Sequence, residues 1–246
     1  MNARPGATAF SWSVFPVVMF GSVALSIAIF ANGGSESLAT LVGLLFGYTI
    51  VILGERLYPF VPDWNRNHDD VATDAAWAGT TLVTGAILRP GSVIVGAWLA
   101  ARFHFVDIGL IAVSYTVPLI ALGADGRVFA LWIVASTVHG ICQHANMQIR
   151  CGPLNWIFSM AELHRWHHSP LVRESNTNYG QTLILWDIVF GTRFLPTDRK
   201  PPEAVGIANL SGFPMTWWAQ LCSPWRWDRV ETPVPDPTAR WTSASP

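Results

Sequence analysis

The sequence predicts an all-α protein, a polytopic bundle of membrane helices that ends in an irregular C-terminal cap. Two observations carry this prediction. The 246-residue chain is 51% hydrophobic and only 13% charged, whereas soluble domains carry roughly 25% charged residues. It also contains several uninterrupted apolar runs that approach the roughly 20 residues needed to cross a bilayer as helix.

The apolar runs give the elements of the bundle in order. A broken run over residues 75–101 is interrupted by Arg89, Pro90 and Gly91, so it fits two short membrane helices or a re-entrant hairpin better than one straight span. The four continuous runs, each a predicted membrane helix, cover residues 12–31, 37–53, 106–122 and 128–147.

The distribution of basic residues predicts the orientation of these helices. Nine of the 15 basic residues lie from Arg150 onward, and Arg56 and Arg66 follow the second run. The positive-inside rule therefore places the loop over residues 54–73 and the C-terminal third in the cytoplasm. A formal net charge of −1 without a basic run argues against nucleic acid binding.

The composition changes near residue 196. We expect a membrane domain over residues 1–196 and an irregular cytoplasmic cap over residues 197–246, because the prolines at 201–202 and 233–237 exclude long helices. Four tryptophans of the cap fit either interfacial anchoring at the lipid headgroups or a packed hydrophobic patch. These are Trp217, Trp218, Trp225 and Trp227.

Three of the seven histidines fall within five positions, at His164, His167 and His168. If this stretch is helical, the three side chains share an arc of roughly 100° on one face. Neutral imidazole is a common ligand of iron, zinc, copper and nickel. The cluster therefore predicts a metal site on the cytoplasmic side of the bundle, and the alternative interpretation is a wet basic surface at a membrane interface.

A second group of polar residues lies near the end of a helix predicted over residues 126–150. At 100° per residue, His139, Gln143 and Asn146 share one face, whereas His144 points about 140° away from His139. Either the two histidines bind different metals, or a π-bulge turns His144 back to the common face. Polar groups in a membrane helix are functional candidates by default, although hydrogen bonding between helices would also explain them.

Five motifs in fixed order resemble the C-terminal half of the fatty acid hydroxylase superfamily, the sterol desaturase-like membrane di-iron oxygenases. The similarity is concentrated in residues 102–196, with weaker similarity around Glu55-Arg56 upstream. The motifs are His139-Gly-x-x-x-His144-Ala-Asn146, Gly152-Pro153-Leu154-Asn155, His164-Arg-Trp-His167-His168-Ser169, Asn178-Tyr179-Gly180 and Leu185-Trp186-Asp187-x-x-Phe190-Gly191-Thr192.

The resemblance implies an iron-dependent enzyme that uses O2 to hydroxylate or desaturate a membrane lipid, with electrons from a separate donor protein. It implies that Asn146, Asn178 and Asp187 orient ligands or stabilise the fold around the site, and that His104 can face it. The positions that it maps onto metal ligands are His139, His144, His164, His167 and His168.

The chain departs from the family pattern in one respect. The family carries two earlier histidine clusters, but here residues 98–101 run directly into Arg102-Phe103-His104, and residues 54–138 contain only His68 and His104. His68 lies in a polar loop, where a solvated side chain is expected. Six candidate imidazoles remain, so we expect the chain to hold at most one metal well.

Three functions follow from these observations. The first is a lipid oxygenase, and the second is a catalytically inactive membrane relic of the same family with an incomplete site. The third is a one-metal hydrolase with zinc-activated water. We rank the hydrolase below the other two, because Glu162 is the only carboxylate near the cluster that could serve as a base.

Overall fold

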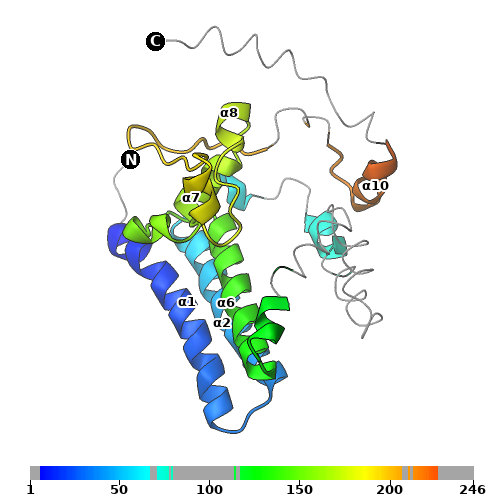
Figure 1. Cartoon of the computed structure of the whole chain (residues 1–246). Helices are drawn as coiled ribbons and strands as arrows, with labels where there is room; N and C mark the ends of the chain where they lie inside the picture. The colour runs from blue at the N-terminus through cyan, green and yellow to red at the C-terminus, as the bar shows by residue number, and fades with distance from the viewer. Residues whose placement is uncertain are drawn as a thin grey trace. The chain divides into compact units, whose positions relative to one another are not determined.

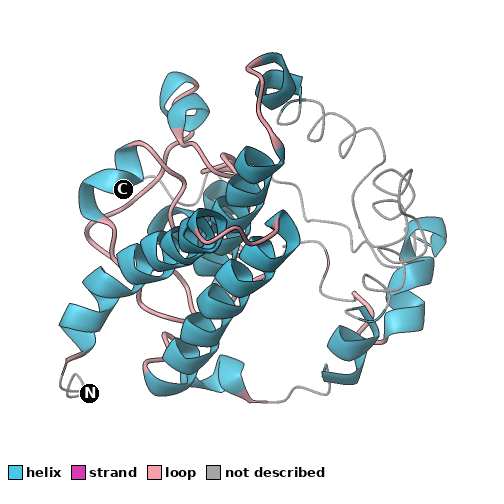
Figure 2. Cartoon of the chain, turned by 90° about the horizontal axis from the view of Figure 1, so that it is seen from below, coloured by secondary structure: helices cyan, strands magenta, loops and turns pink. Residues whose placement is uncertain are grey.

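The computed structural model describes residues 6–66, 71–77, 79, 114, 117–206, 210 and 213–226. These residues are helical or irregular, and the described part of the chain contains no strand (Figures 1 and 2). Two isolated β-bridges join Pro59 to Met147 and Phe158 to Leu183. The predicted all-α class is therefore confirmed.

The chain divides into two compact units. The first comprises Met1–Arg66 and Ala124–Ile207, and the second comprises Asn67–Gly123 and Ala208–Pro246. The division predicted from composition, at residues 196 and 197, stays a prediction.

Two long apolar helices, α1 (Ala7–Ala31) and α2 (Glu36–Leu57), open the first unit. Both are long and apolar enough to cross a membrane, as the runs predicted. Between them the chain turns at Gly33, whose φ of 76° favours glycine. The Ser35 hydroxyl then caps α2 by accepting a hydrogen bond from the Leu38 amide at 3.2 Å.

A third helix, α6 (Gly126–His144), packs against both α1 and α2. The Asp125 carboxylate starts it by accepting hydrogen bonds from the amides of Arg127 and Val128, both at 3.0 Å. Glycines let the helices approach closely, as they do in membrane bundles. A Cβ added to Gly47 of α2, for example, would lie 2.9 Å from a methyl group of Val138.

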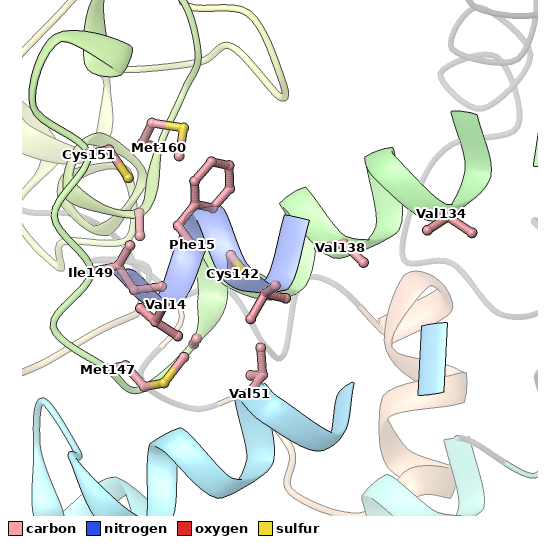
Figure 3. Packing of buried hydrophobic residues seen from close by; sticks show 13 residues of the cluster. Val14, Phe15, Val51, Val134, Val138, Cys142, Met147, Ile149, Cys151 and Met160 are labelled. Carbon is pink, nitrogen blue, oxygen red and sulfur yellow. The ribbon is translucent and has the colours of Figure 1, made fainter. Parts of the chain in front are cut away.

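The core of the first unit lies between these three helices and the segment that follows α6. Val51 of α2 and Val134 and Val138 of α6 belong to one buried cluster with Val14 and Phe15 of α1, and Figure 3 shows Val138 nearer than Val134 to these α1 side chains. At one end of the bundle, Met147 and Cys151 complete the same cluster (Figure 3). The core therefore fixes the end of α6 against the ends of α1 and α2.

The helix predicted over residues 126–150 is shorter than expected, and this prediction was wrong. It ends at His144, and Ala145 is extended, with φ −64° and ψ 136°. The cause is the segment after α2, which satisfies the polar groups of Asn146. The Asn146 side chain exchanges two hydrogen bonds of 2.9 Å with the backbone of Val61, and the Glu55 carboxylate accepts from the Asn146 amide at 2.7 Å.

Short elements complete the first unit and build one end of it, above the bundle in Figure 1. They are η1 (Pro62–Asn65), η2 (Gly152–Trp156), α7 (Ala161–His167), α8 (Val172–Ser175) and α9 (Leu185–Val189).

The second unit contains α10 (Trp217–Cys222) and η3 (Ser223–Arg226). Residues 71–77 are also helical and contact α10, since the Trp77 indole donates to the Gln220 side chain at 2.8 Å. Trp217 packs edge-on against Trp77, with 6.2 Å between ring centroids. Trp227 lies outside the described residues, as do most of the predicted membrane segments over 75–101 and 106–122.

The close approach of α2 to α6 gives a testable prediction. We expect Gly47→Leu to destabilise the protein by about 1 to 3 kcal/mol, because the new side chain must displace Val138 or separate the helices. Thermal unfolding in detergent, followed by tryptophan fluorescence, measures this effect. Gly140→Leu is the matched control, since nothing lies within 4 Å of a Cβ added there. Equal destabilisation by both variants would contradict the packing described here.

Candidate metal centre

Three imidazoles meet at one end of the helical bundle. His144 is the last residue of α6, His164 lies in α7, and His168 directly follows α7. The Nε2 atom of His164 lies 3.0 Å from Nε2 of His144 and 3.0 Å from Nε2 of His168. All three possible ligand atoms lie within 4.8 Å of one another. The structure thus brings together the two histidine-bearing segments, which are 20 residues apart in sequence.

His144 is oriented by the end of its own helix. Its Nδ1 atom lies 2.8 Å from the carbonyl oxygen of Gly140, the residue one turn earlier. A carbonyl only accepts, so Nδ1 carries the proton and Nε2 presents its lone pair to the other two imidazoles. Metal-ligating histidines are usually oriented in this way, through a hydrogen bond from the other ring nitrogen.

His164 and His168 occupy positions i and i+4 and therefore face the same side of α7. Burial, and then the neighbouring imidazoles, lowers the pKa of His164 to about 2 and that of His168 to about 4. Both rings are therefore neutral near pH 7, which is the form that binds a metal. The Nδ1 atom of His164 is buried and has no hydrogen-bond partner among the described residues.

His167 lies beside this cluster without joining the convergence of nitrogens. Its ring is stacked on that of His164, with 5.5 Å between centroids. Its Nδ1 atom lies 2.9 Å from the Thr177 carbonyl oxygen, so Nε2 keeps the lone pair, as in His144. The ring of Tyr179 packs edge-on against that of His167, with 5.7 Å between centroids.

His139 has a different environment from the other α6 histidine. It is buried, and its Nε2 atom lies 3.0 Å from the carbonyl oxygen of Ser159. The amide of Gln143 donates to the same carbonyl. Because α6 is regular α-helix throughout, no π-bulge turns His144 toward the face of His139. The structure therefore does not bring His139 into the three-imidazole cluster.

The remaining predicted residues fall into two groups. His104, and the solvated candidate His68, lie outside the described residues. Asn146 holds the end of α6 against the segment after α2, as described above, and its side chain bonds to that segment instead of to the imidazoles.

Asn178 and Asp187 fix the loop that follows α8. Asn178 has a φ of 51°, and its side-chain amide donates to the carbonyl oxygens of Leu163 at 2.9 Å and Phe194 at 2.8 Å. The buried Asp187 carboxylate accepts from the amides of Tyr179 and Gly180, both at 2.8 Å. These bonds position the segment that contacts His167, so both residues support the site without facing the cluster.

Sequence reasoning missed the role of Arg165. Its guanidinium is buried and donates from one nitrogen to the carbonyls of Ala145 at 3.0 Å and Met147 at 2.7 Å. It also lies 4.1 Å from the ring centroid of Phe60, and burial lowers its pKa to about 10. Arg165 thus ties α7 to the chain just after His144. The one sequence feature that could have indicated this role is the position of Arg165 between histidines of the cluster.

The donor set fits one transition-metal ion. Two imidazole nitrogens that share one ion at about 2.0 to 2.1 Å lie roughly 3 to 4 Å apart, a range that includes both Nε2 distances given above. Three imidazoles suit zinc, copper, iron or nickel. This is the one group of three possible ligands found among the described residues, and it leaves positions for a substrate or a further ligand.

Comparison with known proteins finds one family that matches part of the chain. Residues 92–192 match the fatty acid hydroxylase family, and this match contains the whole three-imidazole cluster. Over this segment the chain is similar to the fatty acid hydroxylase family, as the motifs predicted.

Two relatives match part of the chain. It is 44% identical over 126 residues to the ornithine lipid hydroxylase OlsE of Rhizobium tropici. These aligned residues make up 50% of this chain and 36% of that protein. The chain is 37% identical over 73 residues to the alkylglycerol monooxygenase of Xenopus tropicalis, which covers 30% of this chain and 16% of that protein. The chain thus spans well under half the length of these relatives. No solved structure matches.

The cluster predicts specific metal binding. Purified in detergent, the chain should bind at most about one iron per chain. The His164→Ala variant should lose this binding, because the Nε2 atom of His164 lies 3.0 Å from the Nε2 atoms of both other histidines. Elemental analysis after gel filtration measures the metal content. His68→Ala should bind iron as the wild type does. Two tightly held irons per chain would show that further ligands complete the site.

Proposed function

We propose that this protein is a membrane-bound, iron-dependent oxygenase that hydroxylates or desaturates a lipid at a C–H bond. The proposed reaction requires O2 and electrons from a separate donor protein. The family match and the convergence of His144, His164 and His168 support it. The family uses a di-iron centre, which supplies O2 activation and C–H oxidation when bound.

The observation that carries the proposal is the location of the cluster at the end of two membrane-length helices. His144 ends α6 at the level of the start of α1 and the end of α2. The carbonyl of Ser11 in α1 accepts from the Arg150 amide at 2.8 Å, and Glu55 of α2 accepts from the Asn146 amide at 2.7 Å. A site at the end of a membrane span is within reach of a lipid whose chains lie in the bilayer.

The chain's own residues have defined tasks in this proposal. The three converging imidazoles would hold the metal, and His167, with Nδ1 anchored to the Thr177 carbonyl, offers a further nitrogen beside them. Fully buried Leu163 and Trp166 exclude water from the inner side of α7. Exclusion of water protects an oxidising site from side reactions.

The relatives support a choice of first substrate. The OlsE relative is an ornithine lipid hydroxylase, and the identity of 44% extends over 126 residues. We therefore propose ornithine lipid as the first substrate to test, with simpler phospholipids as comparison. Oxidation of ornithine lipid in preference to the phospholipids would support this choice.

One observation favours the second candidate, a catalytically inactive relic of the family. The segment over residues 98–104 lacks the two histidine clusters that the family carries there, and the three imidazoles that converge among the described residues fit one metal. The zinc hydrolase has less support. The Glu162 carboxylate, its expected base, accepts from the Cys151 amide and the Asn155 side chain, both at 2.7 Å.

Lipid analysis tests the proposed function. Membranes that contain ornithine lipid, from cells expressing the chain with a reductase, should accumulate lipid that has gained one oxygen atom or lost two hydrogens. Mass spectrometry detects both products. His164→Ala should reduce them to background, because the variant removes the central nitrogen of the cluster.

An insertion variant separates the oxygenase from the relic. It carries a family-like segment with the two missing histidine clusters between Ala101 and Arg102. If only this variant oxidises lipid, the chain as it stands is the relic. Oxidation by the His164→Ala variant at the wild-type rate would contradict any catalytic role of the cluster.

A further inference from the structure

Helix α9 (Leu185–Val189) has its polarity inverted relative to a helix in water. Its one charged residue, Asp187, is 2% exposed and points inward to the amides of Tyr179 and Gly180. Its large apolar residues point outward: Trp186 is 63% exposed and Val189 is 60% exposed. A surface helix of a soluble protein shows the opposite arrangement, with the apolar stripe on the core.

The outward apolar residues form one continuous surface with the neighbouring η2 segment. The Ile184 amide, just before α9, donates to the Ile157 carbonyl at 3.1 Å, which joins the two segments. Trp186 stacks on Phe190, with 6.0 Å between ring centroids. We call this surface the α9 patch, and its residues, each at least 52% exposed, are Trp156, Ile157, Leu185, Trp186, Val189 and Phe190.

A cation borders the α9 patch. The guanidinium carbon of Arg193 lies 3.8 Å from the ring centroid of Trp156. Tryptophan and phenylalanine with arginine beside them are typical of surfaces that lie in the headgroup region of a bilayer, where amphipathic rings and basic groups are both favoured. The inward position of the Asp187 carboxylate removes the one negative charge of α9 from this surface.

The α9 patch adjoins the end of a membrane-length helix. Its η2 segment begins at Gly152, where an added Cβ would lie 3.1 Å from the Trp12 ring in the first turns of α1. Trp12 is itself 48% exposed, and the apolar surface of α1 continues from it, with Phe20 69% exposed. The patch therefore continues an apolar helix surface at the end where a bilayer would give way to its headgroups.

We propose that the α9 patch inserts into the headgroup region of the membrane and is a lipid-binding surface of this protein. This second proposal rests on the membrane association that the proposed function includes, and it does not depend on the oxidation of a lipid. A patch exposing this many large apolar residues marks an interaction site. The position beside α1 and the aromatic and basic composition favour lipid over a protein partner.

This surface is connected to the candidate metal centre. Asp187 in α9 holds Tyr179 and Gly180 through their amides, and the Tyr179 ring lies 5.7 Å from that of His167. Insertion of α9 would therefore fix the depth of the histidine cluster in the bilayer. That depth selects which part of a lipid the cluster can reach.

Site-directed spin labelling tests the proposal in the 246-residue chain. Cys222 is replaced by serine, and the buried Cys142 and Cys151 are kept. A nitroxide is attached at Phe190→Cys, and the protein is placed in vesicles of phosphatidylcholine and phosphatidylglycerol. The measured quantity is the accessibility of the label to O2, which concentrates in lipid, relative to a water-soluble nickel chelate.

Two matched sites calibrate this ratio. Leu45→Cys lies on the exposed apolar face of α2, where Leu45 is 56% exposed, and reports lipid. Lys200→Cys, at an exposed position, reports water. We expect the ratio at residue 190 to lie between those at residues 45 and 200, and several-fold above that at residue 200.

Two outcomes would overturn the proposal. A ratio at residue 190 equal to that at residue 200 would place the α9 patch in water. Shielding from both reagents, relieved when the protein is diluted with excess lipid, would show that a second protein copy covers the patch. Neither readout needs iron or turnover. The proposal for the α9 patch can therefore fail while the proposed oxygenase function stands, and the oxygenase function can fail while the patch proposal stands.

A paired variant guards against a local effect of the label. A nitroxide at Ile157→Cys reports the opposite side of the α9 patch. Trp186→Ser with Phe190→Ser should shift its ratio toward water, whereas Leu41→Ser, on the exposed face of α2, should leave it unchanged. Unaltered gel filtration would show that both variants fold, and an unshifted ratio in the first would contradict insertion.

Discussion

The candidate metal centre depends on one buried cation, the guanidinium of Arg165. It donates to the carbonyl oxygens of Ala145 and Met147, directly after the end of α6, while its own residue lies in α7 between His164 and His168. Hydrogen bonds to a charged group contribute about 1.5 to 3 kcal/mol each. Loss of these acceptors would leave an uncompensated buried charge, which is costlier than the bonds themselves. The contact therefore fixes α7 against the end of α6, and with it the distance between His144 and His164.

Other contacts of the site add to the one made by Arg165. Asn146 binds the segment after α2 at the same point in the chain where Arg165 binds its neighbours, so the end of α6 is held from two sides. The imidazoles are then oriented individually, His144 by the Gly140 carbonyl and His167 by the Thr177 carbonyl. Groups pre-positioned in this way lose little freedom when they bind a ligand, which is how a small cluster can hold a metal. The inverted helix α9 belongs to the same arrangement, because its buried Asp187 supports the loop beside His167.

Sequence reasoning predicted the features that depend on local periodicity. The apolar runs predicted α1 and α2, and the spacing of His164 and His168 predicted that they share a face. The angle between His139 and His144 on an ideal helix correctly indicated that they point apart. It did not identify the partner of His139, because the Ser159 carbonyl is presented by a segment whose path no local pattern encodes.

The features that the sequence did not predict depend on distant contacts. The helix predicted to reach residue 150 ends at His144, because Asn146 finds its partner at Val61, 85 positions away. Apolar periodicity continues through Met147 and Ile149, so nothing local marks the change to extended chain. The role of Arg165 was missed because the sequence alone suggests a solvated arginine. Only the structure shows that the side chain is buried and donates to the carbonyls of Ala145 and Met147. The outward face of α9 was missed because five residues are too few for a periodic pattern.

The most direct test of the role of Arg165 is X-ray absorption spectroscopy at the iron edge of the iron-loaded protein, compared between the wild type and Arg165→Leu. The first shell of the wild type should contain about three imidazole nitrogens, as the converging Nε2 atoms require. Arg165→Leu should retain its helices by circular dichroism but lose at least one imidazole from that shell, because α7 is no longer tied to the end of α6. An unchanged shell of three imidazoles in the variant would contradict the claim that Arg165 sets the geometry of the site.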